Sequence, residues 1–364
     1  MPVFGTRADV PWWMQNGRKG DVFILPSSGT DAADNIAVGE ERIMDTHARA
    51  ILRIAGTIVT ADVGPVVYRY ADPARGEQRR PVSVVPAISA LFDSEVEYAR
   101  AGVALDRTYN VRLHSSSNSP RSVSVELSAP GLVVDTAVRR VAMPAFSDAV
   151  LAFHVKGTLP KGRHTISATI TTGDERFIAG YVPLRYEHIR PLRFYRAAAV
   201  QVEAVNASLP RKTTVAYIRG VGDNVATMLG QLGLKVTMVA PEELGDLDLS
   251  KFGSIVVGPR AFAASRELVQ HARRLQDFAR NGGTVVVQYG QQEIQAQGIL
   301  PYPVTLQRTA ERVTDENAPV TLLAPGASVL TTPNKITAED YLDWVQERST
   351  YMPTTADSHY QRIF

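Results

Sequence analysis

The hydrophobic pattern of the chain changes period near residue 210, and this change constrains the fold more than any other feature of the sequence. Between about 82 and 190, apolar and polar residues alternate in short runs. After about 210, short apolar runs alternate with segments whose apolar residues recur at helical spacing. Because side chains alternate across a strand but repeat every 3.6 residues along a helix, the two parts must form different structures.

The alternating part predicts an immunoglobulin-like β-sandwich over residues 79–190. Turn signals such as Ser-Ser-Ser-Asn-Ser-Pro and Leu-Pro-Lys-Gly separate the runs at intervals of about 10 to 15 residues, and no helical period competes with the alternation. The runs that we expect to be strands are 107–115, 121–129, 148–157, 162–173 and 176–186.

The region before the sandwich, residues 1–78, is expected to be a small β-rich unit. The run 65–72 reads as a strand, whereas the segment 42–63 mixes two periods. Residues 71–81 are polar and charged and contain Pro73, Gly76 and Pro81. That composition is typical of a linker, so we expect residues 71–81 to connect the two regions.

The last part of the chain, residues 191–364, is expected to be an α/β domain with a flavodoxin-like parallel sheet. Short apolar strands that alternate with helices indicate a parallel sheet with helices on its faces. We find no strand and helix that would close the sheet after about residue 350, so the domain is expected to be truncated at its C-terminus. The strand-like runs are 213–218, 234–241, 252–259 and 284–290, and the helical segments are 224–233 and 263–283.

A glycine turn joins the first strand of this domain to its first helix and partly matches the dinucleotide-binding fingerprint. Gly220 and Gly222 occupy the first two glycine positions, but Val225 stands at the third. Asp223 or Asn224 is a natural N-cap, and a carboxylate there takes the positive helix end that a phosphate would need. We interpret the turn mainly as a capped connection, with binding of a nucleotide or another polar ligand as alternatives.

A second candidate site is the strand-end turn Tyr289-Gly290-Gln291, which lies where amidotransferase-type α/β domains carry a nucleophilic cysteine. Neither Tyr nor Gln replaces a thiolate as an acyl acceptor at neutral pH without strong activation, so amidotransferase chemistry is not expected. Glu242 and Glu243 lie roughly where an acid that binds ribose would be placed. No catalytic or metal-binding residue is identified. The candidate ligand-binding residues are Gly220, Gly222, Asp223, Asn224, Tyr289, Gly290 and Gln291.

The composition excludes several classes of function. The 39 basic and 37 acidic residues leave a net charge of +2, which does not favour a nucleic-acid arm or a polybasic membrane patch. A chain with 0 cysteines has no disulfides, thiol nucleophiles, cysteine-ligated zinc or iron–sulfur clusters. The 7 histidines form no H-E-x-x-H or H-x-x-H pair, and we interpret His154 and His164 as sheet-face residues. No apolar run approaches the roughly 18 residues of a membrane span.

Several stretches resemble the C-terminal, non-deacetylase region of large bacterial PIG-L family (LmbE-like) deacetylases. In that resemblance, a sandwich leads into an α/β unit similar to class I glutamine amidotransferase domains, and the similarity extends over nearly the whole chain. The stretches of the α/β part are 215–239, 252–262, 281–291 and 351–360, and those that precede or enter the sandwich are 20–43 and 70–93.

The resemblance implies a zinc-dependent N-deacetylase domain elsewhere, with N-acetylglucosaminyl conjugates as substrates and frequent export to the periplasm or medium. The family signature Ala-His-Pro-Asp-Asp is absent from this sequence, so no catalytic residue is carried over and zinc is expected only in the deacetylase domain. The chain is then a non-catalytic accessory region, a fragment whose partner is that domain or an adjacent protein, and which positions the enzyme or binds a carbohydrate.

Two other functions stay open at this point. One is a nucleotide-binding or hydrolytic α/β enzyme that uses the strand-end turns near Gly222 and Tyr289, because ligands of open α/β sheets bind at the carboxyl ends of strands. The other is a structural spacer that binds no ligand.

Overall fold

The computed structural model describes residues 18–19, 22–23, 47–65, 67–81, 85–187, 192–210, 213–307, 311–315, 317–342, 344 and 349–364. The chain divides into two compact units. The first contains Met1–Val96 and Gly102–Glu203, and the second contains Glu97–Ala101 and Ala204–Phe364. The boundaries that the sequence places at 78 and 190 stay a prediction.

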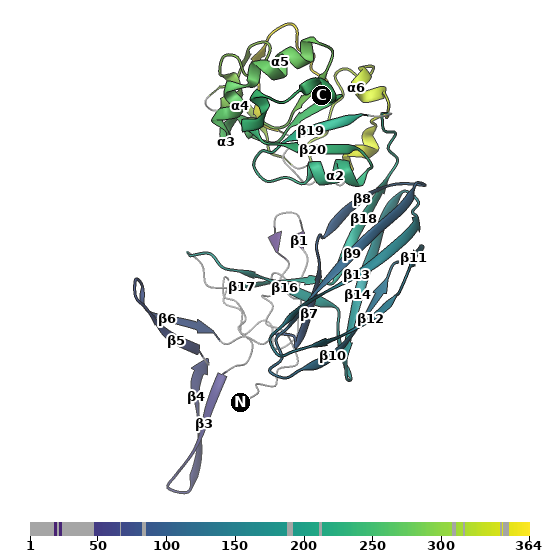
Figure 1. Cartoon of the computed structure of the whole chain (residues 1–364). Coiled ribbons are helices and arrows are strands. Elements are labelled where there is room, and N and C mark those ends of the chain that lie inside the picture. Colours follow the sequence, from purple (N-terminus) through teal and green to yellow (C-terminus); the bar gives the residue numbers. More distant parts are fainter. Residues whose placement is uncertain are drawn as a thin grey trace. The chain divides into compact units, whose positions relative to one another are not determined.

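The first unit is built on two β-sheets (Figure 1), as the alternating pattern predicts. One sheet has the order β11-β13-β9-β7, and the other has the order β12-β10-β14-β18-β8, with β15 paired to β14. The strands of these sheets are β7 (Ile88–Phe92), β8 (Val96–Arg100), β9 (Ala104–Ser115), β10 (Arg121–Ser128), β11 (Leu132–Val134), β12 (Val138–Met143), β13 (Asp148–Thr158), β14 (Gly162–Thr172), β15 (Glu175–Phe177) and β18 (Ala199–Val205). Of their residues, those of β8 after Val96 and those of β18 after Glu203 are counted with the second unit.

The core of the sandwich follows the alternation of the sequence. In β10, Val123, Val125 and Leu127 are buried, while the residues between them are half-buried or exposed. Phe153 and Val155 of β13 are buried in the same alternating manner. Burial of one side chain in two along a strand is what places an apolar face against the core.

Besides the pair β1-β2, three antiparallel strand pairs belong to the described part of the first unit, and one of them corrects a sequence-based expectation. Residues 71–81 are not a linker, because Gly76–Pro81 forms a strand that pairs with Val67–Asp72. The Asp72 carboxylate accepts the backbone N–H groups of Ala74 and Arg75 (2.9 Å each), and this local bond stabilises the turn. The hairpins are β3 (His47–Ile54) with β4 (Thr57–Pro65), β5 (Val67–Asp72) with β6 (Gly76–Pro81), and β16 (Ala179–Leu184) with β17 (Leu192–Ala197).

Most of residues 1–46 lies outside the described residues, apart from β1 (Arg18–Lys19) and β2 (Val22–Phe23), which pair with each other. Among the described residues, no helix combines the length and apolarity that a membrane crossing requires.

The second unit contains a four-stranded parallel sheet in the order β20-β19-β21-β22. Its strands are β19 (Thr214–Ile218), β20 (Lys235–Val239), β21 (Ser254–Val257) and β22 (Thr284–Val287). On one face of the sheet, Val215, Tyr217 and Val256 pack against α2 (Val225–Gln231). On the other face, Ala216 and Ile255 belong to a cluster that includes helical residues from the 261–280 segment. The sheet is therefore covered by helix on both faces, as the sequence predicts.

The prediction of one long helix over 263–283 is wrong, because residues 261–280 form three short helices. They are α3 (Ala261–Ala264), α4 (Arg266–Gln270) and α5 (Ala272–Arg280). Ser265 interrupts the helix with an extended backbone, and its hydroxyl accepts the Leu268 N–H (3.0 Å) as an N-cap. Serine competes for backbone hydrogen bonds and so favours a new helix start over a helix interior. Leu268 and Leu275 are buried, whereas Val269 is exposed.

Replacing Ser265 by alanine is expected to lower the free energy of unfolding by about 1 kcal/mol, because the Leu268 N–H loses its capping acceptor. Arg266→Ala, on the exposed side of the same helix, is the matched control and should change stability by less than about 0.5 kcal/mol. Urea unfolding followed by circular dichroism measures both. Equal effects from the two changes would contradict a capping role for Ser265.

The remaining elements of the second unit are short. The segment from Thr337 forms the 3₁₀ turn η4, in which the Asp340 carboxylate accepts the Thr337 N–H (2.7 Å). Two short strands follow residue 348, and they pair antiparallel with earlier short strands and not with the parallel sheet. These elements are η1 (Pro241–Gly245), η2 (Leu249–Lys251), η3 (Gln292–Gln295), β23 (Val304–Thr305), β24 (Glu311–Val313), α6 (Ser328–Thr331), η4 (Ala338–Tyr341), β25 (Ser349–Met352) and β26 (Thr355–Ala356).

Candidate functional site

The two turns identified from the sequence lie at the same edge of the parallel sheet, where β19, β21 and β22 end. Backbone hydrogen bonds join the turns beyond the strands. The Val221 N–H donates to the Pro259 carbonyl (2.8 Å), and the Arg260 N–H donates to the Tyr289 carbonyl (2.8 Å). The segment after β21 therefore lies between the segments after β19 and β22, and the parallel register brings 220–224 and 289–291 to one edge.

Gly220 is required for packing of two strand-end turns. A Cβ atom at this position would lie 2.1 Å from the carbonyl oxygen of Pro259 and 2.6 Å from the carbonyl carbon of Gly258. Both contacts are to backbone, which cannot rotate away. Gly222, by contrast, has a positive φ of 35° and open space around its Cα. Gly220 thus allows the backbone at Gly258 and Pro259 to approach closely, while Gly222 allows the positive φ of the turn.

Asp223 caps the helix that follows the turn, which decides between the two candidates from the sequence. Its carboxylate accepts the Val225 N–H (2.9 Å) and the Tyr217 hydroxyl (2.5 Å). Asn224 occupies the N-cap position, but its side chain makes no capping hydrogen bond. A negative charge that already binds the first free N–H of α2 occupies the place that a phosphate would take.

Tyr217 is a residue of this edge that the sequence reasoning missed. It is 1% exposed, and its hydroxyl accepts a hydrogen bond from Gln288 Nε2 (3.0 Å) while donating to Asp223. Burial and the hydrogen bond to the Asp223 carboxylate raise the pKa of Tyr217 to about 12. The signal in the sequence was a single tyrosine within the apolar run Val215–Ile218, because a buried tyrosine needs a partner for its hydroxyl.

The second turn, Tyr289-Gly290-Gln291, presents a tyrosine whose ring is partly exposed. The Tyr289 hydroxyl lies 3.0 Å from Thr350 Oγ1 and accepts from Gln291 Nε2 (2.9 Å). Gly290 lets η3 pack closely, because a Cβ there would lie 2.4 Å from Cγ2 of Ile294. The turn thus has the chemistry of a binding surface, with an aromatic ring and an amide.

Glu242 and Glu243, which the sequence placed near a ribose-binding position, lie in η1 after β20. The Glu243 carboxylate accepts the Ala240 N–H (3.0 Å) and so caps its own turn. Glu242 is exposed.

A cavity of about 480 Å³ lies at the opposite edge of the sheet, near the amino ends of β21 and β22. Gly253 and Gly283, which precede these strands, line it together with Arg274. Arg274 has a structural role, because its guanidinium donates to the carbonyl groups of Leu244, Gly245 and Leu247. This cavity does not include the candidate turns.

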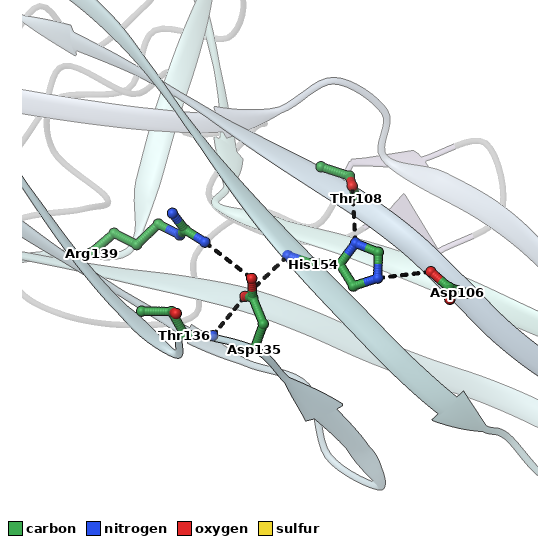
Figure 2. A network of polar contacts seen from close by, with 6 residues as sticks. All are labelled: Asp106, Thr108, Asp135, Thr136, Arg139 and His154. Atoms are coloured by element: carbon green, nitrogen blue, oxygen red, sulfur yellow. Dashed lines mark hydrogen bonds and ion pairs between the residues drawn. The ribbon is translucent and has the colours of Figure 1, made fainter.

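In the first unit, a polar network runs across neighbouring strands (Figure 2). His154 Nε2 lies 2.7 Å from Asp106 Oδ1, and Thr108 Oγ1 lies 3.4 Å from His154 Nδ1. The hydrogen bond from Lys156 and the charge of His154 lower the pKa of Asp106. Thr108 and Asp106 pair in register with His154 and Lys156, so the network is a cross-strand ladder on a sheet face. His154 is the sheet-face residue that the sequence indicated.

Asp135 joins this network from the other side (Figure 2). Its carboxylate accepts the backbone N–H groups of Thr136 (2.6 Å) and His154 (3.4 Å) and lies 3.2 Å from Arg139 Nη2. Within the part of the chain that the structure describes, no group of three or more His, Cys, Asp or Glu side chains is placed to hold a metal ion.

Comparison with known proteins yields no matching family model and no matching curated protein. Among solved structures, Escherichia coli alpha-2-macroglobulin, from domain MG7 to the C-terminus, is 17% identical over 32% of this chain and 16% of that one, with a TM-score of 0.23. A Caenorhabditis elegans MSP family member is 10% identical over 33% of this chain and 98% of that one, with a TM-score of 0.19.

The CARDB domain of a Pyrococcus furiosus protein is 14% identical over 32% of this chain and 94% of that one, with a TM-score of 0.19. At these values the similarities carry no functional information. The chain is β-rich, with immunoglobulin-like β-sandwich domains among its structural neighbours and a parallel sheet in its second unit.

Proposed function

We propose that this chain is a non-catalytic accessory module of a PIG-L-type N-deacetylase, which positions the enzyme or binds a carbohydrate. The observation that carries the proposal is the mutual satisfaction of the polar groups at the strand-end turn. Tyr217, Asp223 and Gln288 bind one another, and Asp223 also caps α2. A hydroxyl, carboxylate and amide engaged in this way stabilise the edge of the sheet, which supports a non-catalytic role.

The proposal includes a flavodoxin-like fold for the second unit, of the kind found in class I glutamine amidotransferases. Counted along the chain, the strand order is 2-1-3-4, which begins the flavodoxin-like order 2-1-3-4-5. The order reverses between β19 and β21, and ligands of such sheets bind outside the carboxyl strand ends at this switch point. Gly220 and Arg260 lie there, so this edge is the proposed binding site.

Amidotransferase chemistry is not part of the proposal. Tyr289-Gly290-Gln291 is proposed to occupy a place comparable to that of the cysteine nucleophile in those enzymes, and the Tyr289 hydroxyl contacts Thr350 and Gln291. A phenol needs strong activation before it can act as an acyl acceptor at neutral pH. The catalytic zinc, the deacetylase domain that holds it, and a periplasmic or secreted location are likewise proposals that rest on the family resemblance.

The first test is an assay of acetate release from N-acetylglucosamine conjugates by the purified chain, with added zinc and with a chelator. We expect no release above the rate without protein, because the proposed role of this chain is to bind or position. Acetate release that zinc supports and the chelator abolishes would overturn the proposal. The same assay on a PIG-L deacetylase that contains the His-Pro-Asp-Asp segment is the positive control.

A further inference from the structure

Two buried side-chain polar atoms of the second unit lack a hydrogen-bond partner among the described residues, namely Arg260 Nε and Glu293 Oε1. Both belong to the carboxyl edge of the sheet. Arg260 directly precedes α3, and Glu293 lies in η3, which contacts α3. Buried polar atoms are nearly always paired, so two unpaired atoms of opposite charge on contacting elements indicate a place that a ligand completes.

The backbone of Arg260 supports a role for its side chain. Its φ of 53° and ψ of 24° place this non-glycine residue in the left-handed region. Glycine or asparagine adopts that conformation at lower cost, and strained residues of this kind cluster at ligand sites. The Arg260 N–H donates to the Tyr289 carbonyl (2.8 Å), which fixes the residue beside the second candidate turn.

At the same edge of the sheet, the Asp223 carboxylate is already engaged, because it binds the Tyr217 hydroxyl and the Val225 N–H. Arg260 Nε and Glu293 Oε1 differ from it in having no hydrogen-bond partner among the described residues. A guanidinium can only donate and a carboxylate can only accept, so a ligand that completes both atoms must offer an acceptor and a donor. Adjacent hydroxyl groups meet both requirements.

The surroundings also fit a sugar ring. Tyr289 is 45% exposed, and an aromatic ring can pack against the apolar C–H face of a sugar.

We propose that this edge binds vicinal hydroxyl groups of a sugar ring, with Arg260 donating to them, Glu293 accepting from them and Tyr289 packing against the ring. This inference rests on the proposed function and names the ligand chemistry of its site. The hydroxyl pair can come from a saccharide or from the ribose of a nucleoside, and the two sources are separated by experiment.

The test is isothermal titration calorimetry of the full chain with methyl mannoside, cellobiose, adenosine and 2′,3′-dideoxyadenosine. We expect the wild type to bind at least one probe with adjacent hydroxyls and not the dideoxy compound. Arg260→Gly and Glu293→Gln should each weaken that binding by at least about tenfold, since each removes one side of the hydrogen-bond pair. Arg273→Ala, exposed on α5, is the control and should leave the affinity unchanged.

Arg260→Gly is not expected to unfold the protein, because glycine adopts the left-handed backbone conformation at this position without strain. A loss of binding in this variant can therefore be assigned to the missing side chain. The melting temperature of this variant should equal or exceed that of the wild type. Wild-type affinity in both variants, or no binding of any probe with adjacent hydroxyls, would overturn the inference. Neither result would bear on deacetylase activity, so the proposed function fails or stands by the acetate assay alone. Binding of adenosine but not saccharides would identify ribose as the source.

Discussion

Gly220→Ala is expected to lower the free energy of unfolding by about 3 kcal/mol or more, the largest effect of any single methyl group at the carboxyl edge of the sheet. The added Cβ would lie 2.1 Å from the Pro259 carbonyl oxygen, and the chain must move to relieve it. That movement would also break the hydrogen bond from the Val221 N–H to the same carbonyl. Urea unfolding monitored by circular dichroism gives the measurement.

Two other glycines of the same segment are matched controls for this change. Gly230 lies within α2 with nothing within 4 Å of an added Cβ, so Gly230→Ala should stabilise the protein by about 0.5 to 1 kcal/mol. Gly222 also has open space but a positive φ of 35°, and Gly222→Ala should cost about 1 kcal/mol. A Gly220→Ala variant as stable as the wild type would show that the two turns are not packed as described.

Raising the pH from 10 to 12 is expected to destabilise the wild type by about 2 to 3 kcal/mol more than a Tyr217→Phe variant. The pKa of Tyr217 is raised from 10.0 to about 12 by burial and by the Asp223 carboxylate. A group whose pKa is higher in the folded state contributes stability below its unfolded pKa and loses it as the pH rises through the folded value. The window of loss is therefore pH 10 to 12.

Urea unfolding of both proteins across this range measures the difference, and the absorbance of tyrosinate provides a second readout. Tyr217 should ionise after the exposed tyrosines in the native protein. At neutral pH, Tyr217→Phe should cost about 1 to 2 kcal/mol, because Asp223 and Gln288 lose their shared partner. Parallel pH profiles for the two proteins would show that the Tyr217 hydroxyl is not held by Asp223.

Prediction from the sequence succeeded where the information is local. The strands of the sandwich and of the parallel sheet follow from side-chain alternation and apolar runs, and a cap at Asp223 or Asn224 follows from their place before a helix. Prediction failed where two local preferences compete. The apolar stripe of 263–283 favours one helix, but Ser265 starts a new one, and the charged segment 71–81 reads as a linker although its hairpin pairing makes it a strand.

The candidate site was located by the sequence but explained only by the structure. Gly220 matched a phosphate-binding pattern. A glycine is needed there, however, because a side chain would clash with the Pro259 carbonyl, about 40 residues further along the chain. Tyr217 and Gln288 are 71 positions apart, and no local pattern relates them. Arg260 and Glu293 stand out only because their burial and lack of partners are known.

The sequence by itself therefore determined the alternating strands of the sandwich, the apolar strands of the parallel sheet and which turn carries a helix cap. These properties depend on the order of neighbouring residues, since periodicity and capping are set within one turn or one strand. Only the tertiary structure decided which strand ends meet, which glycine must lack a side chain, and which buried polar atoms have no hydrogen-bond partner among the described residues. Those properties depend on the register of strands that are distant in the chain. The register decides which distant residues come into contact, and therefore which side chains would clash and which polar groups lose their water.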